Sequence, residues 1–256
     1  MCTIVLVRAP SPGISFLVAA NRDELRGRPS SPPRVWDDGA FVAPRDEVHG
    51  GSWLGLSSRG LFVGVTNRAG APRDPARRSR GELVLLALRA GGLDAARDAA
   101  LAEGAGAFSP YHLVLAQGDR VALIGCDGAR LFEPALGDEP LVVTEQSLRG
   151  EPPARERLVR ERLAERSRDE VTGRAGALEV ARWTALLSLH EPQPFAGTCV
   201  HFDFDEGGQR VSYGTRSSMV LAVRDPLRGS ELHWVEGPPC TTEPRERWTW
   251  LTGLRA

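Results

Sequence analysis

The most conspicuous absence in this 256-residue sequence is lysine, since all 32 basic residues are arginines. Without lysine the chain can neither form a Schiff base on that side chain nor use the lysine of a P-loop. The 28 glycines form no GxGxxG or P-loop pattern, which argues against a nucleotide site. The 33 acidic residues leave a net charge of -1, so no overall field attracts nucleic acid or an anionic membrane.

Long apolar runs are missing too. No run approaches the length of a membrane span. The apolar run at residues 3–7 is shorter than that of a secretory signal and ends at Arg8-Ala9-Pro10. We therefore expect a cytoplasmic protein with no integral membrane association.

Cysteine is scarce, with four residues that form no CxxC pair and no spacing typical of a zinc site. We expect free thiols in a reducing compartment and no bound metal. Cys126 and Cys199 lie in apolar, strand-like runs and are predicted to belong to the core.

The rest of the composition is that of a globular protein, with 41% apolar and 25% charged residues. We expect a single domain over residues 1–256. Apolar, β-branched runs at 1–7 and 16–24 predict a hairpin around the turn at 9–13. Further strands are predicted at 35–36, 40–43, 61–67, 111–116, 120–125, 141–144, 198–204, 213–223 and 231–236, and helices at 82–90, 93–103, 152–166 and 177–189. This order predicts an α+β fold with two antiparallel sheets between helix layers.

Two connections have their own signals. Residues 26–34 are rich in Pro, Ser and Arg and are predicted to be a loop, as are the polar residues 68–80, which we place near the site. The paired glycines Gly50 and Gly51 predict a backbone that passes close to another segment.

The start of the chain carries the main candidate chemistry. Methionine is normally removed before a small residue, and its removal would leave Cys2 with a thiol nucleophile and an α-amine of pKa about 8. The predicted hairpin brings Asn21-Arg22-Asp23-Glu24 towards Cys2, so that Asp23 could hold the amine. The alternative is that Cys2 is an ordinary small residue at the start of a strand.

Several motifs together resemble the NRDE family, also called the transport and Golgi organisation protein family, and they cover nearly the whole chain. They are Met1-Cys2, Asn21-Arg22-Asp23-Glu24, Gly50-Gly51-Ser52-Trp53-Leu54-Gly55, Thr66-Asn67, Ser79-Arg80-Gly81 and Tyr213-Gly214-Thr215-Arg216-Ser217-Ser218.

That family is in turn similar to the N-terminal-nucleophile hydrolases, and most of all to the bile-salt hydrolase and penicillin V acylase branch. The resemblance implies a four-layer αββα fold, with Cys2 as nucleophile, Asp23 holding its amine and the Asn67 backbone N–H facing the oxyanion. Two positions depart from the branch: Ala20 stands where an Arg is usual, and Glu145 stands where the second oxyanion asparagine is expected. An ionised carboxylate there would repel an oxyanion.

Other residues are candidates for ligand contact. Asn21 belongs to the polar cluster expected at the site. Arg22 and Arg216 could bind a carboxylate or phosphate, or pair with acidic groups of the fold, for Arg22 with Glu24 or Glu47. Trp53 could wall a flat apolar ligand or belong to the core.

We therefore expect a Cys2-centred hydrolase of a non-peptide amide or related acyl bond that requires no cofactor and acts on a small molecule. The alternative, implied by the same resemblance, is a protein that binds and traffics haem or a lipid without turnover. Any haem would be non-covalent, because the chain has no CxxCH motif.

Overall fold

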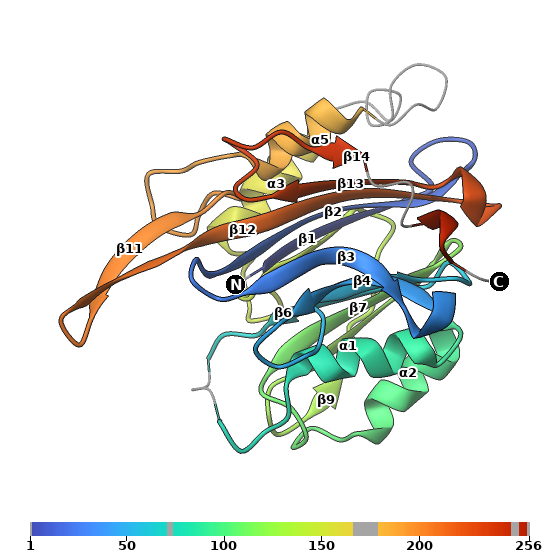
Figure 1. The fold of residues 1–256 in the computed structure, drawn as a ribbon, viewed down its shortest axis with the longest axis horizontal. Coiled ribbons are helices and arrows are strands. Elements are labelled where there is room, and N and C mark those ends of the chain that lie inside the picture. The colour runs from blue at the N-terminus through green and yellow to red at the C-terminus, as the bar shows by residue number, and fades with distance from the viewer. Residues whose placement is uncertain (1, 71–73, 166–178, 247–250, 255–256) are drawn as a thin grey trace.

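The computed structural model describes residues 2–70, 74–165, 179–246 and 251–254. Two sheets lie face to face between two layers of helices, in the order helix, sheet, sheet, helix (Figure 1). All pairs between named strands are antiparallel, so the predicted α+β sandwich is confirmed. Within the described ranges, no helix has both the length and the apolar character needed to cross a membrane.

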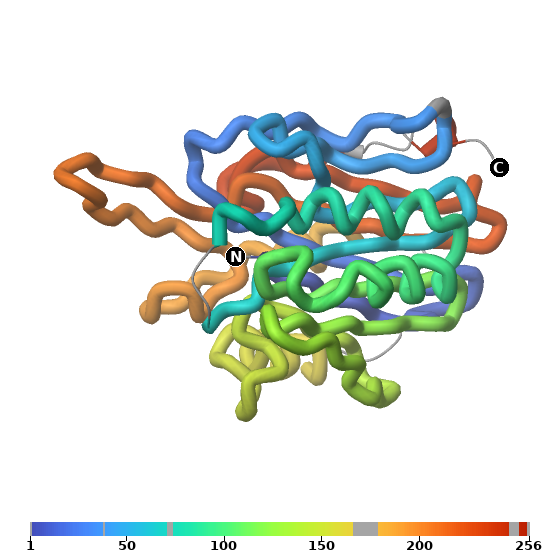
Figure 2. Tube along the Cα trace, turned by 90° about the horizontal axis from the view of Figure 1, so that it is seen from below, coloured from blue at the N-terminus to red at the C-terminus, as the bar shows by residue number. Residues whose placement is uncertain are grey.

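The first sheet joins the N-terminal hairpin to the short strand at 141–143 and to strands between residues 201 and 246. Its strands, in spatial order, are β10 (Leu141–Val143), β1 (Cys2–Arg8), β2 (Ile14–Leu25), β12 (Gln209–Arg224), β13 (Glu231–Glu236) and β14 (Arg245–Glu246), with β11 (His201–Glu206) also paired to β12. The β11–β12 hairpin extends well beyond the sandwich (Figures 1 and 2). Because β1 and β2 are central, the start of the chain is enclosed by later elements.

The second sheet is built almost in chain order. Its strands are β3 (Ser30–Trp36), β4 (Phe41–Asp46), β5 (Leu54–Ser57), β6 (Phe62–Asn67), β7 (Tyr111–Gln117), β8 (Arg120–Cys126) and β9 (Leu131–Phe132). The loop predicted at 26–34 is wrong over Ser30 to Arg34, which form most of β3. Pro32 and Pro33 fall within a register shift on this edge strand, where missing N–H groups leave few ladder bonds unmade.

Helices cover the outer face of each sheet (Figure 1). The second sheet is covered by α1 (Arg80–Arg89) and α2 (Leu93–Ala102), and the first by α3 (Ala154–Ala164) and α5 (Val180–Leu187). The Ser79 hydroxyl accepts a hydrogen bond from Gly81 N–H, while the Glu82 carboxylate accepts one from Ser79 N–H. This capping box starts α1 at Arg80, two residues before the helix start predicted at residue 82.

Alternation along β1 and β2 explains how one hairpin supports two cores. Ile4, Leu6 and Phe16 pack between the sheets, whereas Val5 and Leu17 pack beneath α3 and α5. Since both faces are apolar, the strands show no polar side until their ends, where residues 21–24 begin the candidate site.

Candidate functional site

A cavity of about 710 Å³ opens at the end of the sandwich where Cys2 lies. Six of the eight predicted site residues line it: Cys2, Arg22, Asp23, Trp53, Asn67 and Glu145. The described parts of the 68–80 connection form another part of its wall, as predicted. A Cβ on Gly51 would lie 2.5 Å from the carbonyl carbon of Gly81, so the paired glycines allow the chain to pass directly against the start of α1.

Cys2 is the first residue of β1 and lies opposite Arg22 of β2. Alternation places its side chain on the same face as Ile4 and Leu6, towards the second sheet. Unlike those two buried residues, Cys2 is partly exposed, because it stands at the strand end where the cavity begins. The thiol is therefore accessible from the cavity.

Burial raises the pKa of the Cys2 thiol above its ordinary value, and the charge of Asp23 adds to this effect. The positive charges of the N-terminus and Arg22, with a hydrogen bond from the Asp23 backbone N–H, act in the opposite direction. The net effect keeps the thiol protonated at neutral pH. A nucleophilic Cys2 consequently needs a base beside it.

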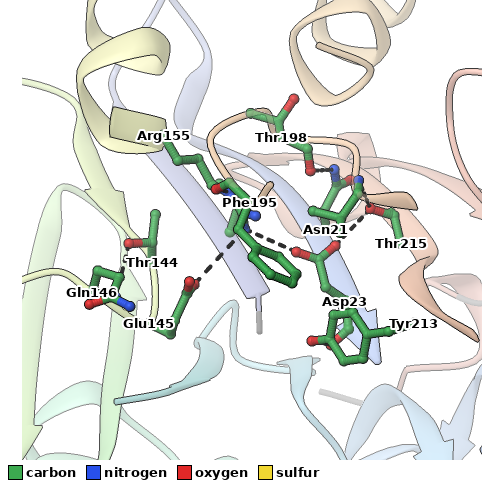
Figure 3. Close-up of polar contacts among 12 residues, drawn as sticks. Asn21, Asp23, Thr144, Glu145, Gln146, Arg155, Phe195, Thr198, Tyr213 and Thr215 are labelled. Atoms are coloured by element: carbon green, nitrogen blue, oxygen red, sulfur yellow. Dashed lines mark hydrogen bonds and ion pairs between the residues drawn. The ribbon is translucent and has the colours of Figure 1, made fainter. Parts of the chain in front are cut away.

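Asp23 is buried on the opposite face of β2, with 1% of its surface exposed. Its Oδ1 accepts a hydrogen bond of 2.7 Å from Thr215 Oγ1, and its Oδ2 accepts one of 2.9 Å from Arg155 Nη1 (Figure 3). Tyr213 OH also donates to the Asp23 backbone oxygen at 2.8 Å. The carboxylate is thus held in one orientation directly behind the start of β1.

Arg155 is the site residue that sequence reasoning missed. It lies on α3 with 2% of its surface exposed and donates to Asp23, Thr3 Oγ1 and the Phe195 backbone oxygen. The sequence around it is so rich in Arg and Glu that α3 looks like a solvated helix. The available signal was that a buried Asp23 needs a cationic partner. Ala20, which stands where an Arg is usual, cannot be that partner.

Glu145 follows β10 and lines the cavity with 5% of its surface exposed. Its Oε2 lies 3.9 Å from Arg155 Nη1 and has no hydrogen-bond partner among the described residues (Figure 3). Its backbone oxygen accepts a hydrogen bond from Ala69 N–H, which joins it to the segment after Asn67. The structure therefore brings both predicted oxyanion positions to the same part of the wall.

Asn67 is the exposed last residue of β6. The next amide, that of Arg68, donates to Pro110 O on the β7 side. Because amides alternate between the two edges of an antiparallel strand, the Asn67 N–H points to the other edge. There β5 begins only at Leu54, opposite Gly64, so this N–H lies beyond the end of the neighbouring strand.

Arg22 is buried and pairs with an acidic group of the fold, which was one of the two alternatives predicted for it. The partner is Asp46 rather than Glu24 or Glu47. The Arg22 Nη2 to Asp46 Oδ2 distance is 3.2 Å, and Arg28 Nε donates to the same oxygen at 2.7 Å. The Arg22 guanidinium also stacks over the Trp53 ring at 4.2 Å. Trp53 itself is both core and cavity wall, since 9% of its surface is exposed.

Asn21 and Arg216 do not line the cavity, so the structure does not bring these two predicted ligand contacts together with the other six residues. The Asn21 amide nitrogen donates to Thr198 O at 2.8 Å (Figure 3). It also donates to Leu187 O at 2.8 Å, and Ser218 Oγ donates to the Asn21 amide oxygen. Arg216 Nη2 donates to the Arg28 backbone oxygen at 3.2 Å. Strand alternation turns Asn21 towards the helix layer, where it ties β2 to α5.

Two solved structures share this architecture. The N-acylethanolamine-hydrolyzing acid amidase ortholog of Caenorhabditis elegans aligns over 86% of this chain and 92% of its own, with a TM-score of 0.57 and 14% identity. The C2A mutant of the conjugated bile acid hydrolase of Clostridium perfringens aligns over 96% of each chain, with a TM-score of 0.52 and 9% identity. At these identities the likeness concerns the fold alone: this protein has the N-terminal-nucleophile hydrolase fold.

The chain belongs to the Transport and Golgi organisation 2 family, whose family model matches residues 1–236. The curated homologues from Mus musculus and Homo sapiens are each 35% identical to it over 92 residues. Those matches cover 33% of this chain and 33% of each homologue, so they span about a third of the relatives' length. The family resemblance inferred from the sequence motifs is confirmed.

Proposed function

We propose that this protein is an N-terminal-nucleophile hydrolase that cleaves a non-peptide amide or related acyl bond through Cys2. The observation that carries this proposal is the placement of Cys2 on the cavity wall with the buried, doubly bonded Asp23 immediately behind it. Cys2 is thus an accessible nucleophile at the first position of β1, and Asp23 is a rigidly held carboxylate beside it.

The chemistry follows from the residues present. Removal of Met1 leaves an α-amine on Cys2, and Asp23 orients this amine. The amine removes the thiol proton, which the raised thiol pKa makes necessary. The thiolate attacks the acyl carbon, the Asn67 N–H stabilises the oxyanion, and the protonated amine gives its proton to the leaving amine. Water then attacks the thioester. The α-amine takes a proton from this water and returns it to the departing thiolate.

The size of the cavity supports a small molecule as the substrate. Its volume of about 710 Å³ falls in the usual range of about 300–1,000 Å³ for ligand sites. Its wall carries arginines and carboxylates together with Trp53 and Val65, which suits a ligand with both an apolar and a polar part. The names of the two structural neighbours, which refer to N-acylethanolamines and conjugated bile acids, recommend N-acyl amides as test compounds.

The test is hydrolysis of an N-acyl amide panel by the wild type, Cys2→Ala and Cys126→Ala. Cys126 is a buried thiol that does not line the cavity. We expect the wild type and Cys126→Ala to release product and Cys2→Ala to fall to the background rate while remaining folded. Inertness of the wild type towards the whole panel, or activity that survives in Cys2→Ala, would contradict the proposal.

Binding without turnover is the second candidate, and Glu145 is the observation that favours it. A carboxylate occupies the wall where an oxyanion donor is expected, which disfavours acyl transfer. Cys2 and His49 are the lining residues that could ligate haem iron. Haem or lipid that co-purifies with the protein and is lost in Cys2→Ala or His49→Ala, with no hydrolysis, would support this candidate.

A further inference from the structure

Two histidines and two cysteines from separate parts of the chain meet at the surface beside the base of the β11–β12 hairpin. They are His190, Cys199, His201 and Cys240, and their ligand-type atoms all lie within 4.8 Å of one another. Cys199 is buried, whereas both histidines are exposed. None of the four lines the Cys2 cavity. Sequence spacing gave no sign of this cluster, because folding joins residues that lie far apart in the chain.

The backbone explains how the first three approach. Cys199 N–H donates to Leu189 O at 3.0 Å, which closes the segment between α5 and β11 on itself. Gly197 permits this closure, since a Cβ there would lie 2.6 Å from Leu189 O. His190 and His201 consequently face each other, with ring centroids 5.3 Å apart.

The three distances among Cys199, His201 and Cys240 are close to the edges of a tetrahedron, and the His190 ligand atom lies within 4.8 Å of all three. The two sulfurs of Cys199 and Cys240 are 3.6 Å apart, and His201 Nε2 lies 3.5 Å from the first and 3.2 Å from the second. With Zn–S bonds of about 2.3 Å and Zn–N bonds of about 2.0–2.1 Å, such edges measure about 3.8 Å between sulfurs and about 3.5 Å between sulfur and nitrogen.

We propose that His190, Cys199, His201 and Cys240 bind one zinc ion in a closed, structural Cys₂His₂ site. Two thiolates and two neutral imidazoles suit zinc and balance its charge. Binding requires both thiols to release their protons to solvent. Because all four positions are filled by protein, the ion holds the fold together and has no open position for a substrate.

A disulfide between the two cysteines is the competing use of this pair. It would leave both histidines without a role, although His201 Nε2 is in contact with both sulfurs.

Arg26 supplies a further constraint, since its Nη2 lies 2.7 Å from His201 Nδ1. Arginine can only donate, whereas a neutral imidazole bound through Nε2 carries its proton on Nδ1. Arg26 must therefore swing away when the ion binds.

The site lies directly behind the candidate active site. The segment that carries Cys199 and His201 is bonded to Thr215 through Val200, whose N–H donates to Thr215 Oγ1 and whose carbonyl accepts from Thr215 N–H. Thr215 Oγ1 in turn donates to Asp23 Oδ1 (Figure 3). A bound ion would fix the segment that carries Cys199 and His201. It would also link the segment around Cys240, which follows β13, to the Thr215 hydroxyl that holds Asp23.

The test uses the full chain without a histidine tag, purified under reducing conditions. We expect elemental analysis to find one zinc per chain. After chelation and anaerobic addition of Co²⁺, we expect the intense visible bands of tetrahedral cobalt and a thiolate-to-cobalt charge-transfer band. Absence of zinc together with absence of these bands would overturn the proposal, as would quantitative formation of a Cys199–Cys240 disulfide in the presence of zinc and reductant.

Variants assign the ligands. Cys240→Ser and His190→Ala should each lose the metal while remaining folded, with chelator lowering the melting temperature of the wild type and not of either variant. Cys2→Ser and His49→Ala remove a thiol and an imidazole elsewhere and should keep the metal. Arg26→Gln should bind cobalt at least as tightly as the wild type, since it frees His201. Metal retention by Cys240→Ser, or loss in the two controls, would contradict the assignment.

Discussion

The two faces of the β1–β2 hairpin differ in what their polar side chains contact. On the helix-facing side, Asn21 and Asp23 are each held by several hydrogen bonds from neighbouring elements. On the cavity side, Cys2 is partly exposed and the nearby Glu145 Oε2 has no hydrogen-bond partner within the described residues. The fold thus separates support from reactivity, so the first face should govern stability and the second should govern chemistry.

The largest effect should come from the support face. Arg155→Ala leaves Asp23 buried without its cation, which should lower the free energy of unfolding by about 3–5 kcal/mol and abolish activity. Arg157→Ala removes an exposed arginine from the same helix and should change stability by less than about 0.5 kcal/mol. Urea denaturation of both variants gives the comparison. Equal, small changes would show that Asp23 does not depend on Arg155.

A double-mutant cycle sharpens that result. Asp23→Ala should lower stability by about 2–5 kcal/mol. The combined variant Asp23→Ala/Arg155→Ala should be less destabilised than the sum of the single changes, because neither charge is then left alone in the interior. Strict additivity in the same urea experiment would place the two residues in separate networks.

On the cavity face, Glu145→Asn should change rate with little change in stability. The substitution replaces a carboxylate that opposes the oxyanion with a donor, and one such donor is worth about 10²–10³ in rate. We expect faster turnover of the N-acyl amide panel, while Glu151→Gln, an exposed charge change outside the cavity, should leave it unaltered. A slower Glu145→Asn would mean that the carboxylate takes part in the reaction or binds the substrate.

The smallest effect concerns the thiol itself. Burial raises the Cys2 pKa and Arg22 partly offsets this, so iodoacetamide should alkylate Cys2 faster as pH rises beyond the ordinary thiol range. Arg22→Gln removes a positive charge that favours the thiolate and should move the midpoint of this profile to still higher pH. Arg28→Gln, which also contacts Asp46, should not move it. Peptide mapping at each pH measures the fraction of Cys2 that has been alkylated.

The sequence predicted the parts of the molecule that depend on local signals. The helix predicted at 82–90 corresponds to α1, and alternating apolar residues mark β1 and β2. The family motifs placed Cys2, Asp23 and Asn67 around one cavity. Local reasoning was wrong for β3, because an edge strand tolerates the prolines that would disrupt a central one.

Parts that depend on distant pairing could not be predicted. Arg155 reaches Asp23 across 132 positions of the chain, and its own neighbours on α3 resemble a solvated helix. Cys199 and Cys240 are 41 positions apart and meet only after β11 and β13 have each paired with β12. No periodicity or spacing encodes either contact. The physical signal in both cases is a buried or clustered group that requires a partner.

Intact-mass spectrometry of the protein during reaction with the N-acyl amide panel tests the central claim most directly. The account predicts that the mature chain begins at Cys2 and carries a transient mass increase equal to one acyl group. Peptide mapping should place this group on Cys2, and Cys2→Ala should not acquire it. A chain that retains Met1 in most molecules, or that forms product with no adduct at Cys2, would contradict the account.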